Sequence, residues 1–124
     1  MNILEHSTKP ERKVVGESDG LNAYLLLHLQ NVHIQTSSFF TRLQMLDLGS
    51  NPINNRVDFS NLFMNISGQP VHFFDAEKVD GDIIVRNAKD GEKFTDLFGT
   101  EHLLQSNDIV ITDKKKILAL AGVV

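Results

Sequence analysis

The sequence predicts an α+β fold in which two short helices pack on a mostly antiparallel β-sheet or barrel formed by the second half of the chain. Apolar residues recur at helical spacing in two segments between residues 37 and 68. Beyond Asp75 the pattern changes to short apolar segments separated by turn residues, which is typical of strands joined by hairpins. With 124 residues, 41% of them apolar and 23% charged, the chain has the size and composition of one soluble globular domain.

The first 20 residues are predicted to be a flexible arm, followed by a folded domain over residues 21–124. The arm is polar and ends in Gly-Glu-Ser-Asp-Gly at residues 16–20, a composition that favours turns and loose chain. Residues 24–34, YLLLHLQNVHI, are rich in strand-compatible apolar side chains. We expect a strand there.

Two helices are predicted next. Ser37 or Ser38 can cap the first, because its hydroxyl can accept a free backbone N–H, and Gly49 ends it. Asp58 is placed as the cap or a first-turn acid of the second helix, which ends at Gly68. The apolar stripes are Phe39, Leu43 and Leu46 in the first helix and Phe59, Leu62, Phe63 and Ile66 in the second. We expect the second stripe to pack against the sheet.

Three polar residues of the second helix, Asp58, Asn61 and Asn65, are spaced three and four apart. Residues at this spacing share one face of a helix, so these side chains are expected to point the same way. The sequence therefore predicts a polar or wet surface opposite them.

The strands of the sheet are predicted in the four segments 82–86, 93–97, 108–112 and 116–124. Asp90-Gly91, Phe98-Gly99 and the lysine run 114–116 separate them as turns. The lysine run could contact phosphate, but a solvated hairpin turn is the interpretation we favour.

Composition excludes several classes of function. The chain has no cysteine, so it can form neither a disulfide nor a thiolate metal site nor a cysteine nucleophile. A net charge of −4 argues against tight RNA binding by this chain alone. No run approaches the roughly 20 apolar residues of a membrane helix, and we expect a cytoplasmic protein.

Motifs for self-contained catalysis are missing as well. The sequence has no G-x-S-x-G elbow, no glycine-rich phosphate loop and no H-E-x-x-H helix. His28 and His33 lie five residues apart on the predicted strand, which places them on opposite faces, and no zinc spacing exists. What stands out is residues 52–75, PINNRVDFSNLFMNISGQPVHFFD, where Pro, Gly, Asn and His gather around one helix and suggest a shaped pocket.

This block resembles the editing domain of the bacterial phenylalanyl-tRNA synthetase beta subunit, which carries a pattern close to P-I-N-N-x-V-D-x-T-N-Y followed by G-Q-P-x-H-A-F-D. The resemblance continues through residues 80–104, DGDIIVRNAKDGEKFTDLFGTEHLL, and 108–124, DIVITDKKKILALAGVV, so it covers roughly residues 24–124. We therefore interpret residues 21–124 as part of that editing domain.

The resemblance implies a function. In the family this domain hydrolyses tyrosine wrongly esterified to tRNA(Phe), while ATP-dependent charging takes place in the alpha subunit. A pocket that hydrogen-bonds a phenolic hydroxyl rejects phenylalanine, because its polar groups would then stay unpaired. The implied partners are the alpha subunit and tRNA(Phe), reached through the whole beta subunit, with neither membrane nor DNA; no cofactor is expected in this portion, and ATP and magnesium serve the whole synthetase.

The resemblance also implies site residues. The Thr-Asn of the family's helix corresponds to Ser60 and Asn61, which are expected to bind substrate, and the family's histidine corresponds to His72. His72 would orient the ester or the attacking water beside a ribose hydroxyl of the tRNA, without forming a covalent bond to substrate. Structural alternatives stay open: His72 could be held in its loop by Asp75 or a backbone carbonyl, and Asn61 could brace a loop. Asp58 and Asp75 are interpreted as capping and turn residues rather than catalytic acids.

Two departures from the family bear on activity. Phe73 stands where the family usually has alanine, and a ring pointing inward there would line, or fill, the aminoacyl pocket. The chain also ends at Val124, before the family's glycine pair and the glutamate that contacts the tyrosine hydroxyl. We expect the isolated chain to lack appreciable ester hydrolysis and ligase activity. The alternatives are a freestanding protein that edits mischarged tRNA in trans and a structural module that has lost editing.

Overall fold

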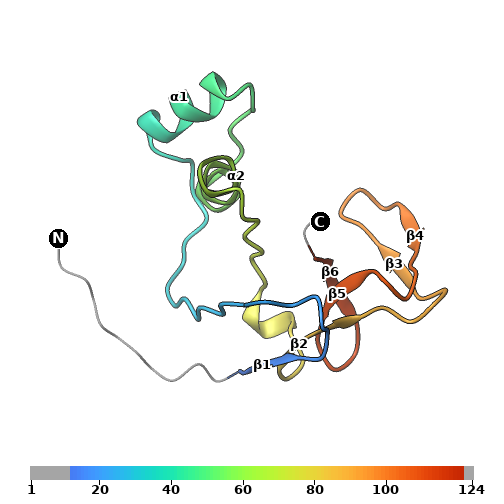
Figure 1. Ribbon diagram of the computed structural model, residues 1–124. Coiled ribbons are helices and arrows are strands. Elements are labelled where there is room, and N and C mark those ends of the chain that lie inside the picture. Colours follow the sequence, from blue (N-terminus) through green and yellow to red (C-terminus); the bar gives the residue numbers. More distant parts are fainter. Residues whose placement is uncertain (1–11, 122–124) are drawn as a thin grey trace. The chain divides into compact units, whose positions relative to one another are not determined.

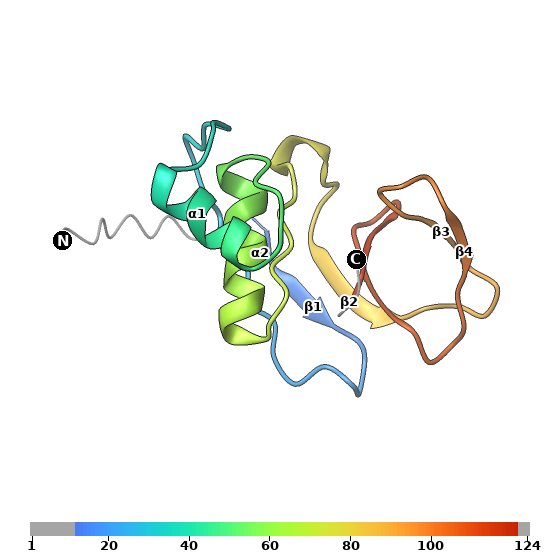
Figure 2. The same cartoon turned by 90° about the horizontal axis from the view of Figure 1, so that it is seen from above.

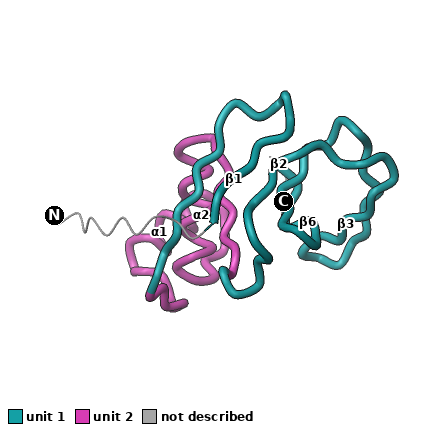
Figure 3. Tube along the Cα trace, turned by 90° about the horizontal axis from the view of Figure 1, so that it is seen from below, with its two compact units in different colours: residues 1–30, 76–122, 124 teal, residues 31–75, 123 magenta. Residues whose placement is uncertain are grey.

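The computed structural model describes residues 12–121 and divides the chain into two compact units. Of the described residues, unit 1 takes 12–30 and 76–121, and unit 2 takes 31–75 (Figure 3). Unit 1 carries the strands and unit 2 the two α-helices, with most strands in the second half of the chain (Figure 1). The predicted α+β class is confirmed.

Unit 1 contains a four-stranded sheet, a two-stranded ribbon and one 3₁₀ turn. The sheet has the order β1-β2-β5-β6, with β1 parallel to β2 and the other pairs antiparallel. The elements are β1 (Val14–Gly16), η1 (Ala76–Lys78), β2 (Ile83–Asn87), β3 (Lys93–Thr95), β4 (Glu101–Leu103), β5 (Ile109–Thr112) and β6 (Ile117–Leu120). Among the described residues β1 and β6 have a neighbour on one side only, so the sheet is open and the barrel alternative is wrong.

The core of unit 1 lies along the central strands. Val85 and Val110 are 1% and 0% exposed. They lie on strands that have a neighbour on each side, and such covered strands carry unbroken apolar runs. The chain from β2 through β3 and β4 to β5 forms a loop (Figure 2). Its inward side chains make one buried cluster of Ala88, Phe94, Leu104 and Val110, against which Ile117 and Leu120 pack.

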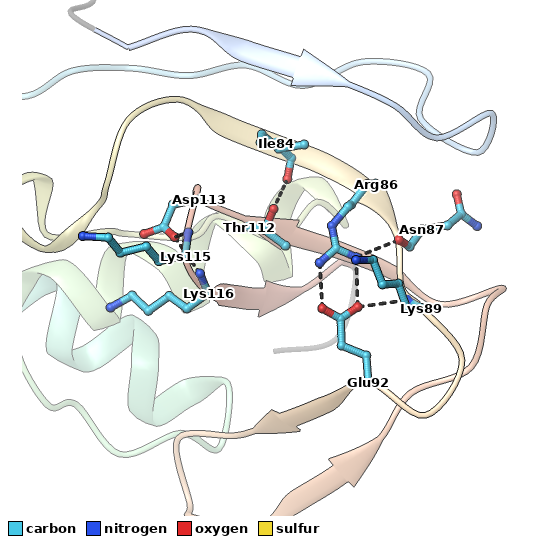
Figure 4. A network of polar contacts seen from close by, with 9 residues as sticks. All are labelled: Ile84, Arg86, Asn87, Lys89, Glu92, Thr112, Asp113, Lys115 and Lys116. Carbon is cyan, nitrogen blue, oxygen red and sulfur yellow. Dashed lines mark hydrogen bonds and ion pairs between the residues drawn. The ribbon is translucent and has the colours of Figure 1, made fainter.

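The predicted turns of this sheet are confirmed. Gly91 and Gly99 have φ of 74° and 83°, the left-handed conformation that glycine adopts without steric cost. Residues 114–116 form the turn between β5 and β6, as the favoured interpretation of the lysine run predicts. Asp113 holds this turn by accepting the backbone N–H groups of Lys115 and Lys116 at 2.7 and 2.8 Å (Figure 4).

Unit 2 contains α1 (Phe39–Asp47) and α2 (Asn55–Ser67). Ser38, the second of the two predicted caps, accepts the N–H of Thr41 at 3.1 Å. Asn54 caps α2, and Asp58 lies in the first turn, as one predicted alternative requires. Gly49 and Gly68 follow the helices with φ of 73° and 70°, so both predicted helix ends are confirmed.

The strand predicted at residues 24–34 is wrong, because that segment forms no strand. Its end is held instead by Asn55, whose side chain binds the carbonyl of His33 at 3.0 Å and the N–H of Gln35 at 3.1 Å, while its N–H donates to the Gln35 carbonyl at 2.8 Å. Strand-forming residues need a partner strand, and here a side chain supplies the hydrogen bonds.

The predicted arm also needs correction. Val14–Gly16 form β1, which pairs with Ile83–Val85, because β-branched valines fit a pleated edge. Residues 1–11 of the arm lie outside the described residues. A further strand, β4, was not predicted, since its three residues are all exposed and carry no apolar alternation.

The predicted burial of the α2 stripe is wrong for three of its four members. Phe59 and Ile66 are 52% and 76% exposed, and Phe63 is 41% exposed. Phe59 and Phe63 instead stack on each other with ring centroids 6.0 Å apart, the contact available to residues four apart on a helix. The apolar stripe is therefore formed as predicted, but most of it faces solvent.

Candidate functional site

The candidate site is built where the chain returns along α2 after Gly68. The left-handed conformation of Gly68 reverses the chain, so that Val71 lies beside the middle of the helix. There the Ser60 hydroxyl donates to the Val71 carbonyl at 2.8 Å. Ser60 is expected to bind substrate. In the structure its only hydroxyl proton is donated in this hydrogen bond, which holds the segment that carries His72 and Phe73.

Phe73 packs against the helix. Its ring meets Phe59 edge-to-face, with centroids 6.2 Å apart and planes at 69°. The flanking rings of His72 and Phe74 stack on each other, with centroids 6.1 Å apart and planes at 12°. A stack between residues two apart places both on one side of an extended segment, and the residue between them on the other. Phe73 and His72 therefore point away from each other.

His72 is half-buried. Burial lowers the pKa of its imidazole below the ordinary value of 6.5, because removal from water disfavours the cation. The neutral ring is the form that can accept a proton from water or donate a hydrogen bond to an ester oxygen. The contact that the structure shows for the ring is the stack on Phe74, and a hydrogen bond from His72 to Asp75 or a carbonyl stays a prediction.

Asn61 follows Ser60 on α2 and is half-buried. Its backbone carbonyl accepts the side-chain amide of Asn65 at 2.8 Å, a bond between consecutive turns of one helix. That bond leaves the side-chain amide of Asn61 for other partners. Whether Asn61 and His72 share one cavity stays a prediction.

At Asp58 the predicted polar face of α2 meets polar groups of the protein and not water. Asp58 is 0% exposed, and its carboxylate accepts the Ser37 hydroxyl at 2.5 Å and the Ile53 N–H at 2.8 Å. Both carboxylate oxygens are therefore occupied by groups from the loops before the helices. This supports the interpretation of Asp58 as a structural residue and not a catalytic acid, since an acid must reach substrate.

Two concave regions occur within the units, and neither is lined by the predicted site residues. In unit 2 a groove of about 240 Å³ is lined by Thr36, Ser37, Phe39, Arg42, Leu43, Leu46, Pro52, Ile53 and Asp58. In unit 1 a cavity of about 350 Å³ is lined by Glu77, Lys78, Val79, Asp80, Asp113, Lys115 and Lys116. Within residues 12–121, no three His, Asp or Glu side chains gather as a metal site requires. Sequence reasoning missed the groove, because Phe39, Leu43 and Leu46 were interpreted as the apolar stripe of a helix packed on the sheet.

Polar contacts in unit 1 hold the sheet rather than a site. Arg86 forms a bidentate pair with Glu92, with N–O distances of 2.7 and 2.9 Å, and Glu92 also accepts the Lys89 N–H at 2.9 Å (Figure 4). The hydrogen bond from Arg86, followed by that from the Lys89 backbone, lowers the pKa of Glu92 to about 2. The carboxylate is thus locked in its charged form between β2 and β3. No helix within the described residues is long and apolar enough to cross a membrane.

Residues 20–124 of this α+β chain match the B3/4 domain family, and the chain belongs to it. The proteins it is similar to are beta subunits of phenylalanine–tRNA ligase. Identity is 48% over 103 residues with that of Latilactobacillus sakei, covering 81% of this chain. It is 43% over 112 residues with that of the Onion yellows phytoplasma and 40% over 124 residues with that of Staphylococcus aureus, covering 90% and 98% of this chain.

The chain spans 13% to 16% of the length of these relatives. The resemblance to the phenylalanyl-tRNA synthetase beta subunit that the motifs indicated is confirmed by these matches.

Proposed function

We propose that this chain is a portion of a phenylalanine–tRNA ligase beta subunit, and that it supplies His72 and Asn61 to a site that hydrolyses tyrosine misattached to tRNA(Phe). The observation that carries the proposal is the half-buried imidazole of His72, with a lowered pKa, on a segment anchored to α2 through Ser60. The similarity to beta subunits of phenylalanine–tRNA ligase supports the assignment to that subunit.

In this function His72 acts as a neutral hydrogen-bonding group. A neutral imidazole can orient the attacking water or the ester oxygen, while a ribose hydroxyl of the tRNA assists the leaving group. Asn61 provides amide hydrogen bonds to the aminoacyl or ribose portion of the substrate. Ser60 acts indirectly, because its hydroxyl positions the backbone next to His72.

The remaining requirements of the synthetase lie outside this chain. We assign charging with ATP and magnesium, and contact with the alpha subunit, to the whole enzyme in the cytoplasm. Among the described residues, no three acidic or histidine side chains gather as a metal site requires.

A chimera tests the proposal. In the Latilactobacillus sakei beta subunit, the segment that aligns with this chain over 103 residues would be replaced by the matching part of this chain. The chimera would be purified with its alpha subunit and assayed on Tyr-tRNA(Phe). We expect hydrolysis that His72→Ala reduces by about 10²-fold or more, within the range for loss of a proton-handling group, and that the exposed-loop control His33→Ala leaves unchanged. A chimera that charges tRNA(Phe) with phenylalanine but does not hydrolyse Tyr-tRNA(Phe) would favour a structural module that has lost editing.

A further inference from the structure

The groove of unit 2, here called the α1–α2 groove and lined by the nine residues named above, is apolar on its outer walls. Phe39, Leu43, Leu46 and Ile53 are 70%, 47%, 55% and 68% exposed. These residues come from one face of α1 and from the loop before α2, so they form a contiguous surface within one unit. A soluble protein that leaves this much apolar surface together in water uses it for contact with another molecule or segment.

Arg42 supplies the polar feature of the groove. Its Nε is buried and has no hydrogen-bond partner among the described residues. A buried donor without an acceptor is costly, and an arginine fork pairs best with a carboxylate or phosphate. The carboxylate of Asp58, which also lines the groove, binds Ser37 and Ile53. The Nε of Arg42 is therefore left without an acceptor among the described residues.

Unit 2 also lacks a complete core of its own. Among its described residues the buried apolar side chain is Met45, whereas the other buried apolar residues belong to unit 1. Helices of 9 and 13 residues are marginal in water and depend on burial of their apolar faces. The surface that would complete this core must come from outside the unit.

We propose that the α1–α2 groove binds a polypeptide segment from another part of the same beta subunit. The segment combines apolar side chains with a carboxylate, and the carboxylate pairs with Arg42. The inference rests on the assignment of the chain to that subunit and not on editing. Relatives are several times longer, since the chain spans 13% to 16% of them, so they contain ample chain to cover the groove.

The chemistry favours a polypeptide over RNA. Apolar walls offer nothing to a hydrated phosphate backbone, whose binding needs an excess of cations. The lining of the groove contains one arginine together with the buried acid Asp58. An apolar side chain flanked by a carboxylate satisfies both the walls and Arg42.

Thiol labelling tests this in the 124-residue chain and in the full-length chimera described above. The chain has no cysteine, so Leu43→Cys places one thiol in the groove and Lys93→Cys places a control thiol on β3. We expect the Leu43→Cys thiol to label at least about tenfold more slowly in the chimera than in the isolated chain, and the Lys93→Cys thiol to label equally in both. Hydrogen exchange of α1 in the unsubstituted proteins gives the same comparison without any variant.

Arg42→Met in the chimera should restore fast labelling of the Leu43→Cys thiol, because the methionine keeps the stem and loses the charge. Equal labelling and equal α1 exchange in the two proteins would overturn the proposal. If labelling of the isolated chain is slow and becomes faster on dilution, a second copy covers the groove. If labelling slows only when tRNA is added, RNA covers the groove. Either result would overturn the proposal. Protection of α1 in a chimera without Tyr-tRNA(Phe) hydrolysis would leave this proposal standing and remove the editing function.

Discussion

Phe73 lies edge-to-face against Phe59 on α2, with ring centroids 6.2 Å apart, while His72 beside it turns its ring onto Phe74. The residue that departs from the family's alanine thus has a packing partner on the helix. This geometry supports a site on the His72 side that the Phe73 ring does not fill, and it changes what substitution of Phe73 should do.

We predict that Phe73→Ala lowers stability more than it changes editing. Loss of a half-buried ring and its contact with Phe59 should cost about 1 kcal/mol of unfolding free energy, measured by urea denaturation of the 124-residue chain. In the chimera, Tyr-tRNA(Phe) hydrolysis should stay within about threefold. The control Phe98→Ala removes a ring that is 88% exposed and should alter neither quantity. A rise in hydrolysis of tenfold or more on Phe73→Ala would show that the ring blocks the site.

We predict that Glu92→Gln destabilises the chain by about 1 to 2 kcal/mol at pH 7, because it breaks the bidentate pair with Arg86. The side chains of Arg86 and Glu92 are each 23% exposed. The folded-state pKa of Glu92 is depressed from its ordinary 4.5 to about 2. The carboxylate's contribution is therefore full above pH 4.5 and is lost as the pH falls from 4.5 toward 2. Urea denaturation of both proteins at pH 7 and pH 2.5 measures the difference.

Glu101→Gln is the matched control for that experiment. Glu101 pairs with Lys93 at 2.7 Å, but the two side chains are 55% and 64% exposed. Exposed pairs contribute little, so this change should cost less than about 0.5 kcal/mol at either pH. Equal effects of the two substitutions would contradict the assigned role of the Arg86–Glu92 pair.

We predict that Asp58→Asn destabilises unit 2 by about 2 kcal/mol. The asparagine amide cannot accept from both the Ser37 hydroxyl and the Ile53 N–H, as the carboxylate does, so a buried donor is left unpaired. Asp47→Asn, at the exposed end of α1, should change stability by less than about 0.5 kcal/mol. The measurement is hydrogen exchange of α2 amides; unchanged exchange in the Asp58→Asn protein would contradict the prediction.

We predict that His72 titrates below 6.5, since burial lowers its pKa. The unfolded chain then takes up the proton first, so the stability that depends on neutral His72 should decrease as the pH falls from 6.5 through the folded-state pKa. The titration is followed by NMR of the imidazole protons. Phe74→Ala removes the stacked ring and should move the midpoint back toward 6.5, whereas an unmoved midpoint would show that Phe74 does not bury His72.

Local features followed from the sequence wherever the physics is local. Several local features were predicted, because each depends on a residue and its near neighbours. They are the cap at Ser38, the place of Asp58 in the first turn of α2, the helix ends at Gly49 and Gly68, and the hairpin turn at residues 114–116. The family, too, was readable from residues 52–75. Segments such as 24–34 were not, because a strand exists only when a partner supplies its hydrogen bonds.

The sequence by itself determined the α+β class, the two helices, four of the strands and the family. Only the tertiary structure decided that Asp58 is buried, that Val14–Gly16 pair with β2, that Ser60 anchors Val71, and that Phe73 packs on Phe59. Periodicity specifies which side chains share a face, but not what lies opposite that face. What covers a helix face depends on segments distant in sequence. No local pattern therefore encodes the exposure of the α2 stripe, or the lack of a partner for the Nε of Arg42 among the described residues.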